Sequence, residues 1–356
     1  MTSFYPWQKT QWQSLQTAFE KNRLSHAYVL SGPEGIGKAA FACAFAEFLL
    51  RAPYRARLGE SGEDPGAPPS RVQAGSVRVH GAHKNTTVSH PGAPPSRVQA
   101  GRVRAHPDFI SLTSEEKSTT IKIDQIRELR HKLSQTAHAG GYRIVIINPA
   151  DTLPVAASNA LLKTLEEPSD RVIFFLIDHQ TVSMLPTIIS RCQKINFSSA
   201  DQADMLTWLQ SQFPDEKNLD VLLRLTGFAP LKVQSWIENH CLALRDQLFQ
   251  HLTKCLKKQS NPITPVPILL KNELLLVLQL LLLLCIDLSR VKFEVKNNHV
   301  INIDLFAKMK TVAGMISIQK LQQLIKMLLD TKNILARGVH LNAQLCLENL
   351  LIEWER

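Results

Sequence analysis

The first 197 residues alternate between short apolar runs and longer segments with helical spacing. Apolar runs without polar alternation occupy residues 27–31, 109–112, 144–147 and 172–177. Helical patterns occupy residues 39–50, 123–133 and 156–167. Strands that are apolar on both faces, and separated by helices, are typical of a parallel sheet covered on both sides. We therefore predict an α/β domain over residues 1–197.

From residue 200 onwards almost every segment has helical spacing, apart from a weak strand-like alternation over residues 292–304. The longest apolar stretch, residues 274–286, contains 13 residues, and charged residues flank it closely. A bilayer core requires about 20 residues. We interpret this stretch as a core helix and expect no membrane-spanning segment. The pattern predicts that helical domains follow the α/β domain.

Residues 54–104 differ from the rest of the chain, because they are rich in Gly, Pro, Arg and Val and lack any periodicity. Residues 65–75 recur as residues 91–101, a duplication with a period of 26. Two such copies cannot form a core, so we predict an inserted, largely disordered loop. Its histidines lack the spacing of a metal site, and no metal is expected.

The net charge of +10 is concentrated in the same region. Residues 51–105 contain nine Lys/Arg and three Asp/Glu, a net of +6, which leaves +4 for the rest of the chain. An excess of basic residues suggests a nucleic-acid partner, but most of this excess lies within this one region of the chain. The six cysteines form no C-x-x-C pair, and the first residues have no apolar core of signal-peptide length. These features predict reduced thiols and a cytoplasmic protein.

One phosphate-binding motif lies between the first apolar run and the first helix. Gly32-Pro-Glu-Gly35-Ile-Gly37-Lys38 fits G-x-x-x-x-G-K. In this motif backbone N–H groups and the helix N-terminus cradle phosphate, while the lysine reaches the outer phosphates. The next residue is Ala39, whereas an active ATPase has a Ser or Thr hydroxyl that binds Mg²⁺. We predict a degenerate P-loop at Gly32, Gly35, Gly37 and Lys38.

The second element of a P-loop ATPase is a strand that ends in acids for Mg²⁺ and for water. After residues 144–147 come Asn148 and Pro149, and neither residue supplies a carboxylate. Asp151 lies three residues beyond the expected position and is a poor substitute. The sequence therefore predicts the fold of an ATPase without its metal chemistry.

A candidate catalytic arginine follows the last strong strand. Ser190-Arg191-Cys192 comes about a dozen residues after residue 177. A planar guanidinium at a subunit edge can stabilise a transferring phosphoryl group as an arginine finger. The tripeptide alone is a weak signal, and a surface arginine is its default interpretation.

Together these motifs resemble the subunits of the bacterial DNA polymerase III clamp loader, which belong to the AAA+ family. The matching strings are Tyr5-Pro-Trp7, Arg23-Leu-Ser-His26-Ala27, His106-Pro-Asp-Phe109, the Ala-Leu-Leu-Lys-Thr-Leu-Glu-Glu-Pro run that ends at Pro168, Ser190-Arg191-Cys192, and the C-terminal stretch 338–354. The resemblance covers nearly the whole chain apart from the insert. It implies an AAA+ α/β domain over residues 1–197, a small helical lid domain over 198–242 and an all-α collar domain over 243–356.

The resemblance also implies a role. Loss of the magnesium ligands at Ala39, Asn148 and Pro149 favours the delta-prime type of subunit, a non-hydrolysing stator. Arg191 is then an arginine finger that acts in trans on the ATP site of a neighbouring gamma/tau subunit, with Ser190 and Cys192 as supporting residues. The implied partners are gamma/tau and delta, with the sliding clamp and primed DNA reached through the complex.

The chain would thus be a component of a DNA-directed DNA polymerase (nucleotidyltransferase) holoenzyme without ATPase turnover of its own. Two departures from the family remain. The family's four-cysteine zinc module is missing between the P-loop helix and His106, so zinc binding is predicted to be lost. Gly37 and Lys38 persist, so weak ATP or ADP binding stays open. The alternatives are a self-sufficient P-loop ATPase and a DNA-binding protein that uses the basic insert.

Overall fold

A computed structural model describes residues 4–51, 106–113, 121–133, 141–179, 184–197, 201–296, 299–336, 339 and 341–355. The predicted insert at 54–104 lies outside the described residues. The chain divides into two compact units, Met1–Asp204 and Met205–Arg356. The ranges predicted as lid and collar both belong to the second unit, apart from residues 198–204, and the boundary between them stays a prediction.

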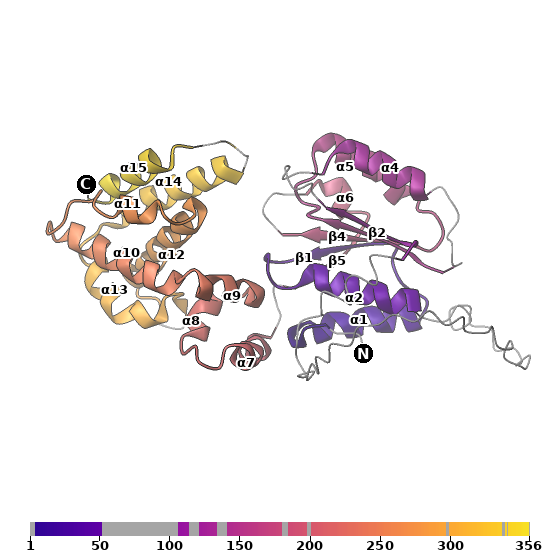
Figure 1. The fold of residues 1–356 in the computed structure, drawn as a ribbon, viewed down its shortest axis with the longest axis horizontal. Coiled ribbons are helices and arrows are strands. Elements are labelled where there is room, and N and C mark those ends of the chain that lie inside the picture. The colour runs from indigo at the N-terminus through magenta and orange to yellow at the C-terminus, as the bar shows by residue number, and fades with distance from the viewer. Residues whose placement is uncertain are drawn as a thin grey trace, which may run out of the picture. The chain divides into compact units, whose positions relative to one another are not determined.

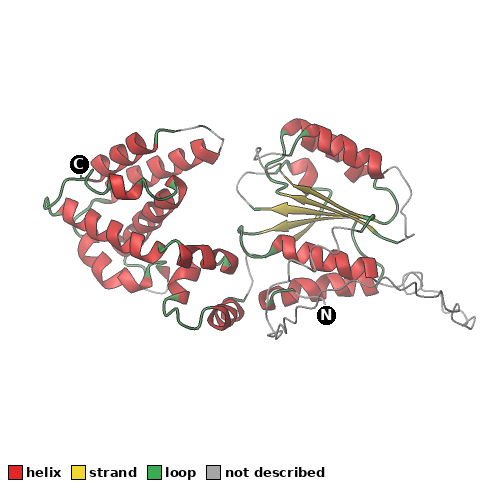
Figure 2. Cartoon of the chain, viewed as in Figure 1, coloured by secondary structure: helices red, strands yellow, loops and turns green. Residues whose placement is uncertain are grey.

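A five-stranded sheet with only parallel pairings forms the centre of the first unit, in the order β2-β3-β4-β1-β5 (Figure 2). Its strands are β1 (Ala27–Ser31), β2 (Phe109–Thr113), β3 (Arg143–Asn148), β4 (Val172–Asp178) and β5 (Gln193–Asn196). The predicted α/β class with a parallel sheet is confirmed. The first four strands coincide with the four apolar runs. Three of them, β1, β3 and β4, are buried on both faces, whereas β2 lies at an edge of the sheet and is only partly buried.

Helices cover both faces of this sheet (Figure 1). The pair α1 and α2 lies on one face, and the pair α4 and α5 lies on the other. The helices of the unit are η1 (Pro6–Gln8), α1 (Lys9–Glu20), α2 (Lys38–Arg51), α4 (Ile123–Leu133), α5 (Val155–Glu166) and α6 (Pro186–Ile189). Ile126, Leu129 and Leu133 bury the inner stripe of α4, as its spacing predicts.

The sequence pattern did not reveal β5. This strand has four residues, three of them exposed, and it pairs only with β1, so it lies at the edge of the sheet. A short strand that pairs with a neighbouring strand on one side only is largely open to solvent, so its sequence contains no continuous apolar run. Its position nevertheless matters, because it begins two residues after Arg191.

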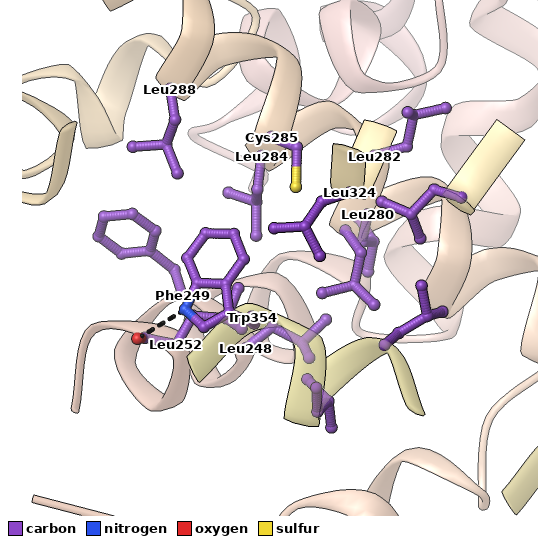
Figure 3. Packing of buried hydrophobic residues seen from close by; sticks show 14 of the residues in the cluster. Leu248, Phe249, Leu252, Leu280, Leu282, Leu284, Cys285, Leu288, Leu324 and Trp354 are labelled. Atoms are coloured by element: carbon purple, nitrogen blue, oxygen red, sulfur yellow. Dashed lines mark hydrogen bonds between the residues drawn. The ribbon is translucent and has the colours of Figure 1, made fainter. Parts of the chain in front are cut away.

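The second unit is helical, as predicted, throughout its described residues. Its helices are α7 (Gln202–Gln212), which starts just before the unit boundary, α8 (Leu219–Leu225), α9 (Pro230–Glu238), α10 (Cys241–Leu256), α11 (Val266–Leu269), α12 (Leu274–Lys292), η4 (Ile303–Leu305), α13 (Phe306–Ala313), α14 (Ile318–Ala336) and α15 (Ala343–Glu355). Figure 3 shows the apolar packing around α12, where Trp354 also donates its indole N–H to the Leu252 carbonyl at 3.1 Å.

The central helix α12 is longer than the apolar stretch that predicted it, with 19 residues. By length and composition alone it could cross a membrane, but 56% of its most apolar window is buried inside the unit. Val277, Leu280 and Leu284 are fully buried, on a helix that packs against α13 and α14. This burial is what a core helix requires.

The strand-like alternation over residues 292–304 was misleading. Among the described residues of this segment there is no strand, and η4 begins at Ile303. The reason is the buried carboxylate of Asp287, which accepts hydrogen bonds from the backbone N–H groups of Ile301 and Asn302. Because those donors are used by a side chain, they cannot form a sheet ladder.

Candidate functional site

The P-loop follows β1 at the carboxyl edge of the sheet and leads into α2. Its three glycines have positive φ angles, +154° at Gly32, +88° at Gly35 and +91° at Gly37. The last two lie in the region that favours glycine, so the loop turns back on itself in the manner of a phosphate cradle. The sequence correctly located this loop between a strand and a helix.

Lys38, the first residue of α2, folds back onto the loop. Its ammonium donates to the carbonyls of Gly32 and Pro33, both at 2.7 Å, and the side chain is only 2% exposed. A buried ammonium requires such acceptors. To meet a phosphate, Lys38 would have to exchange these carbonyls for the ligand.

The N-terminal segment packs directly against the P-loop. Trp7 and Gln8 both donate side-chain N–H groups to the Ile36 carbonyl, at 3.0 and 3.1 Å. A Cβ added at Gly37 would lie 2.8 Å from Gln8 Nε2 and from the ring of Tyr5. Gly37 is therefore required for close packing as well as for its backbone angle. The string Tyr5-Pro-Trp7 thus has a structural role beside the loop.

The polar groups at the ends of β3 and β4 are engaged with other side chains. Asn148 Oδ1 lies 3.0 Å from His179 Nε2, and Ser31 donates its hydroxyl to Asp178 Oδ2 at 2.6 Å. Asp151 is buried, at 4% exposure, in the turn after β3. Sequence analysis missed Asp178 and His179, although both come directly at the end of an apolar run.

These residues do not fit a magnesium–nucleotide complex. Ala39 offers a methyl group where a hydroxyl ligand is required, and the amide oxygen of Asn148 faces His179. Within the described ranges no group of three or more His, Cys, Asp or Glu could hold a metal ion. The P-loop geometry is therefore present without the donors that ATP hydrolysis uses.

Arg191 lies between α6 and β5, and its guanidinium has three acceptors. Nη2 donates to Glu166 Oε1 at 2.6 Å, and Nη1 donates to the Thr187 carbonyl at 2.9 Å and to Ser190 Oγ at 3.4 Å. The Arg191 side chain is 35% exposed. Glu166, the last residue of α5, is a partner of Arg191 that sequence analysis did not single out.

Arg191 and the P-loop lie at opposite edges of the same sheet. β5 is parallel to β1, with Gln193 opposite Tyr28 and Asn196 opposite Ser31. Arg191 therefore precedes the amino end of β5, whereas Gly32 follows the carboxyl end of β1. At about 3.3 Å per residue, the strand alone separates the two by about 13 Å. The arginine cannot reach a phosphate held by its own P-loop.

The neighbours of Arg191 have supporting positions. Ser190 donates its hydroxyl to the Thr187 carbonyl at 3.1 Å, which fixes the turn. Cys192 packs against the core cluster beneath α5, and burial raises the pKa of its thiol to about 11. A thiol of that pKa is protonated at neutral pH and is a poor nucleophile. Cys192 is thus a packing residue.

Comparisons with known proteins agree with this architecture. A family model described as DNA polymerase III, delta subunit, matches residues 7–59 and 86–201. A second model, for the C-terminal part of the DNA polymerase III delta subunit, matches residues 239–356. The interruption at 60–85 falls inside the range predicted as an insert.

Named relatives point the same way. The chain is 35% identical to the DNA polymerase III subunit delta' of Pseudomonas aeruginosa, over 73% of this chain and 69% of the relative. It is 28% identical to the delta' subunit of Yersinia pestis, over 99% and 96%. A crystal structure of a DNA polymerase III gamma subunit-related protein from Thermotoga maritima is 17% identical, over 70% of this chain and 83% of that one, with a TM-score of 0.34. On the evidence of the family models and the two delta' relatives, the chain belongs to the delta' subunit family of DNA polymerase III, the clamp-loader subunits of DNA replication.

Proposed function

We propose that this chain is a non-hydrolysing stator of the clamp loader that supplies Arg191 in trans to the ATP site of a neighbouring gamma/tau subunit. The observation that carries the proposal is the separation of Arg191 from the chain's own P-loop across the sheet. A half-exposed guanidinium at a sheet edge is available to a second subunit. The role of gamma/tau and delta as partners, and of clamp and primed DNA as targets of the complex, is part of this proposal.

The proposal includes the absence of turnover by the chain itself. Ala39, Asn148 and Pro149 provide no magnesium ligand of the usual strength, and Lys38 is already held by two carbonyls. We therefore expect this chain to have little or no affinity for ATP or ADP. We also expect it to bind no zinc, because it lacks the cysteines of the family's zinc module. A self-sufficient ATPase is the less favoured alternative for the same reasons.

The second unit offers apolar surface for the partners. Ile268, Leu275 and Leu345 are exposed at 54%, 45% and 63%. Exposed large apolar side chains on several helices are typical of a subunit interface. All six cysteines are free thiols, which is typical of a reducing compartment, and the complex is proposed to be cytoplasmic.

The test is reconstitution with gamma/tau and delta, with wild type compared with Arg191→Ala. If the finger acts in trans, hydrolysis at the ATP site that it serves falls by on the order of 10³-fold in single-turnover measurements. Arg127→Ala is the matched control, because Arg127 is an exposed arginine of the same unit that pairs with Asp124 in a surface contact. Normal hydrolysis and clamp loading by the Arg191→Ala complex would show that the assignment is wrong.

A further inference from the structure

Six lysines from three segments of the second unit surround the short helix α13. They are, in chain order, Lys254, Lys257, Lys292, Lys296, Lys308 and Lys310, and together they form the α13 basic surface. Lys308 and Lys310 belong to α13 itself, while the others lie at or just after the C-terminal ends of α10 and α12. The fold thus gathers positive charge that is spread over 57 positions of the sequence.

Two cavities flank α13 and contain these lysines. A cavity of about 610 Å³ lies between the end of α12 and one face of α13, and Lys292, Lys296 and Lys310 line it. A cavity of about 500 Å³ lies between α10 and the other face, with Lys254, Lys257 and Lys308 among its lining residues. The charges therefore border hollows that an extended ligand can enter.

The acids that could neutralise this surface are few. Glu294 lines the first cavity and Asp246 the second, but Asp246 forms an ion pair with the buried Arg245 at 2.7 Å. In the described part of the chain none of the six lysines takes part in an ion pair, whereas Lys320 pairs with Glu353. Lys292 donates to the Ala313 carbonyl at 2.8 Å, which leaves its charge without a neutralising acid. Ammonium groups gathered within a Debye length repel each other, and a polyanion relieves that repulsion.

Aromatic rings accompany the charges. Phe306 lines the first cavity, with the Lys310 ammonium 4.9 Å from the centre of its ring. Phe293, which directly follows Lys292, is 68% exposed, the largest exposed fraction among the large apolar side chains described. An exposed ring beside lysines provides a face on which a nucleobase can stack. An acidic peptide would use the lysines alone.

We propose that the α13 basic surface binds single-stranded nucleic acid, with phosphates on the lysines and a base stacked on Phe293. A positively charged groove with interleaved aromatic rings is the usual arrangement for sequence-independent single-strand binding. All residues of this site belong to the second unit, whereas Arg191 and the P-loop belong to the first. The site does not depend on the proposed arginine finger.

The experiment measures the affinity of the full chain for a fluorescent 20-mer of thymidine over a series of salt concentrations. The test variant is Lys296→Gln with Lys308→Gln and Lys310→Gln, and the matched control is Lys217→Gln with Lys271→Gln and Lys326→Gln. All six are exposed lysines of the same unit. We expect the test variant to lower the affinity about tenfold at low salt and to reduce the salt slope by about 2, at 0.7 per phosphate contact, with the control near wild type.

Phe293→Ala separates stacking from charge. It should weaken binding about fivefold without a change in salt slope, because no phosphate contact is lost. Equal losses in the two lysine triples, or no binding at low salt, would overturn the proposal. So would tighter binding of a duplex of the same length, or preferential binding of polyglutamate, which would assign the surface to another kind of partner. Circular dichroism of each variant verifies that its helices are intact.

Discussion

At the scale of single residues, the ion pair between Arg191 and Glu166 contributes little to folding stability but fixes the orientation of the Arg191 guanidinium. The two side chains are 35% and 47% exposed, so solvent screens their attraction, and the pair contributes less than about 1 kcal/mol to folding. The bond of 2.6 Å nonetheless fixes Nη2, while Thr187 and Ser190 hold Nη1. Three acceptors on one guanidinium leave it little rotational freedom.

Glu166→Gln should therefore separate positioning from stability. The amide keeps the shape of the carboxylate but weakens the contact, so we expect the free energy of unfolding to change by less than about 1 kcal/mol. ATP hydrolysis by the reconstituted complex should fall by about threefold to tenfold, less than for Arg191→Ala, because a loosened guanidinium is misplaced. In an Arg191→Ala background the same substitution should have no further effect. An additional loss there would mean that Glu166 acts on something other than Arg191.

Cys192 is a second residue whose environment leads to a testable prediction. With a pKa of about 11, raised by burial, only about one thousandth of it is thiolate at pH 8. Alkylation by iodoacetamide, followed by peptide mass mapping, should be slow, and its rate should keep rising with pH beyond 9. An ordinary thiol levels off near its pKa of about 8.5. Unfolding in urea should restore that ordinary behaviour, and rapid labelling of the folded protein at pH 7 would contradict the packing role.

At the scale of elements, Asp287 joins the end of α12 to the segment before α13. Its carboxylate is completely buried and accepts from Arg290, from the backbone of Ile301 and, at 2.7 Å, from both the backbone and the side chain of Asn302. Removal of the carboxylate leaves several buried donors without an acceptor. Such losses are among the most destabilising of single substitutions.

Asp287→Ala should destabilise the second unit by about 3 kcal/mol in urea titrations followed by circular dichroism. Asp330→Ala is the control, because Asp330 is exposed on α14, and its effect should stay below about 0.5 kcal/mol. A loss of under about 1 kcal/mol for Asp287→Ala would show that water or a local rearrangement replaces the carboxylate.

The same scale shows what a sequence can and cannot predict. β4 and α4 were predictable because burial on both faces, or on one helical stripe, leaves a periodic record in the chain. The P-loop was predictable because its motif consists of consecutive residues. β5 depends on a partner strand far away in sequence, and the Glu166–Arg191 bond joins positions 25 residues apart. Contacts of this kind arise from the fold and leave no periodic signal.

At the scale of the whole molecule, the charge of +10 has two separate sources. Residues 54–104 contain eight Lys/Arg and three Asp/Glu, a net of +5, which leaves +5 for the rest of the chain. In the described part of the chain, the six lysines around α13 form one group of that remaining positive charge. A DNA affinity measured on the full chain could arise from either source, so the two must be separated by deletion.

Replacement of residues 54–104 by a linker of about ten Gly/Ser residues makes that separation. Since β1 and β2 lie parallel in one sheet, α2 returns the chain to the edge where β2 begins, and such a linker spans about 17 Å. We expect the first unit to become more stable by about 1 kcal/mol, because a shorter loop loses less entropy on closure. At physiological salt the affinity for single-stranded DNA should change by less than about threefold, because all the residues of the proposed binding surface belong to the second unit and are retained. Loss of binding on deletion would instead assign DNA binding to the insert, and loss of stability would show that the insert contributes to the fold.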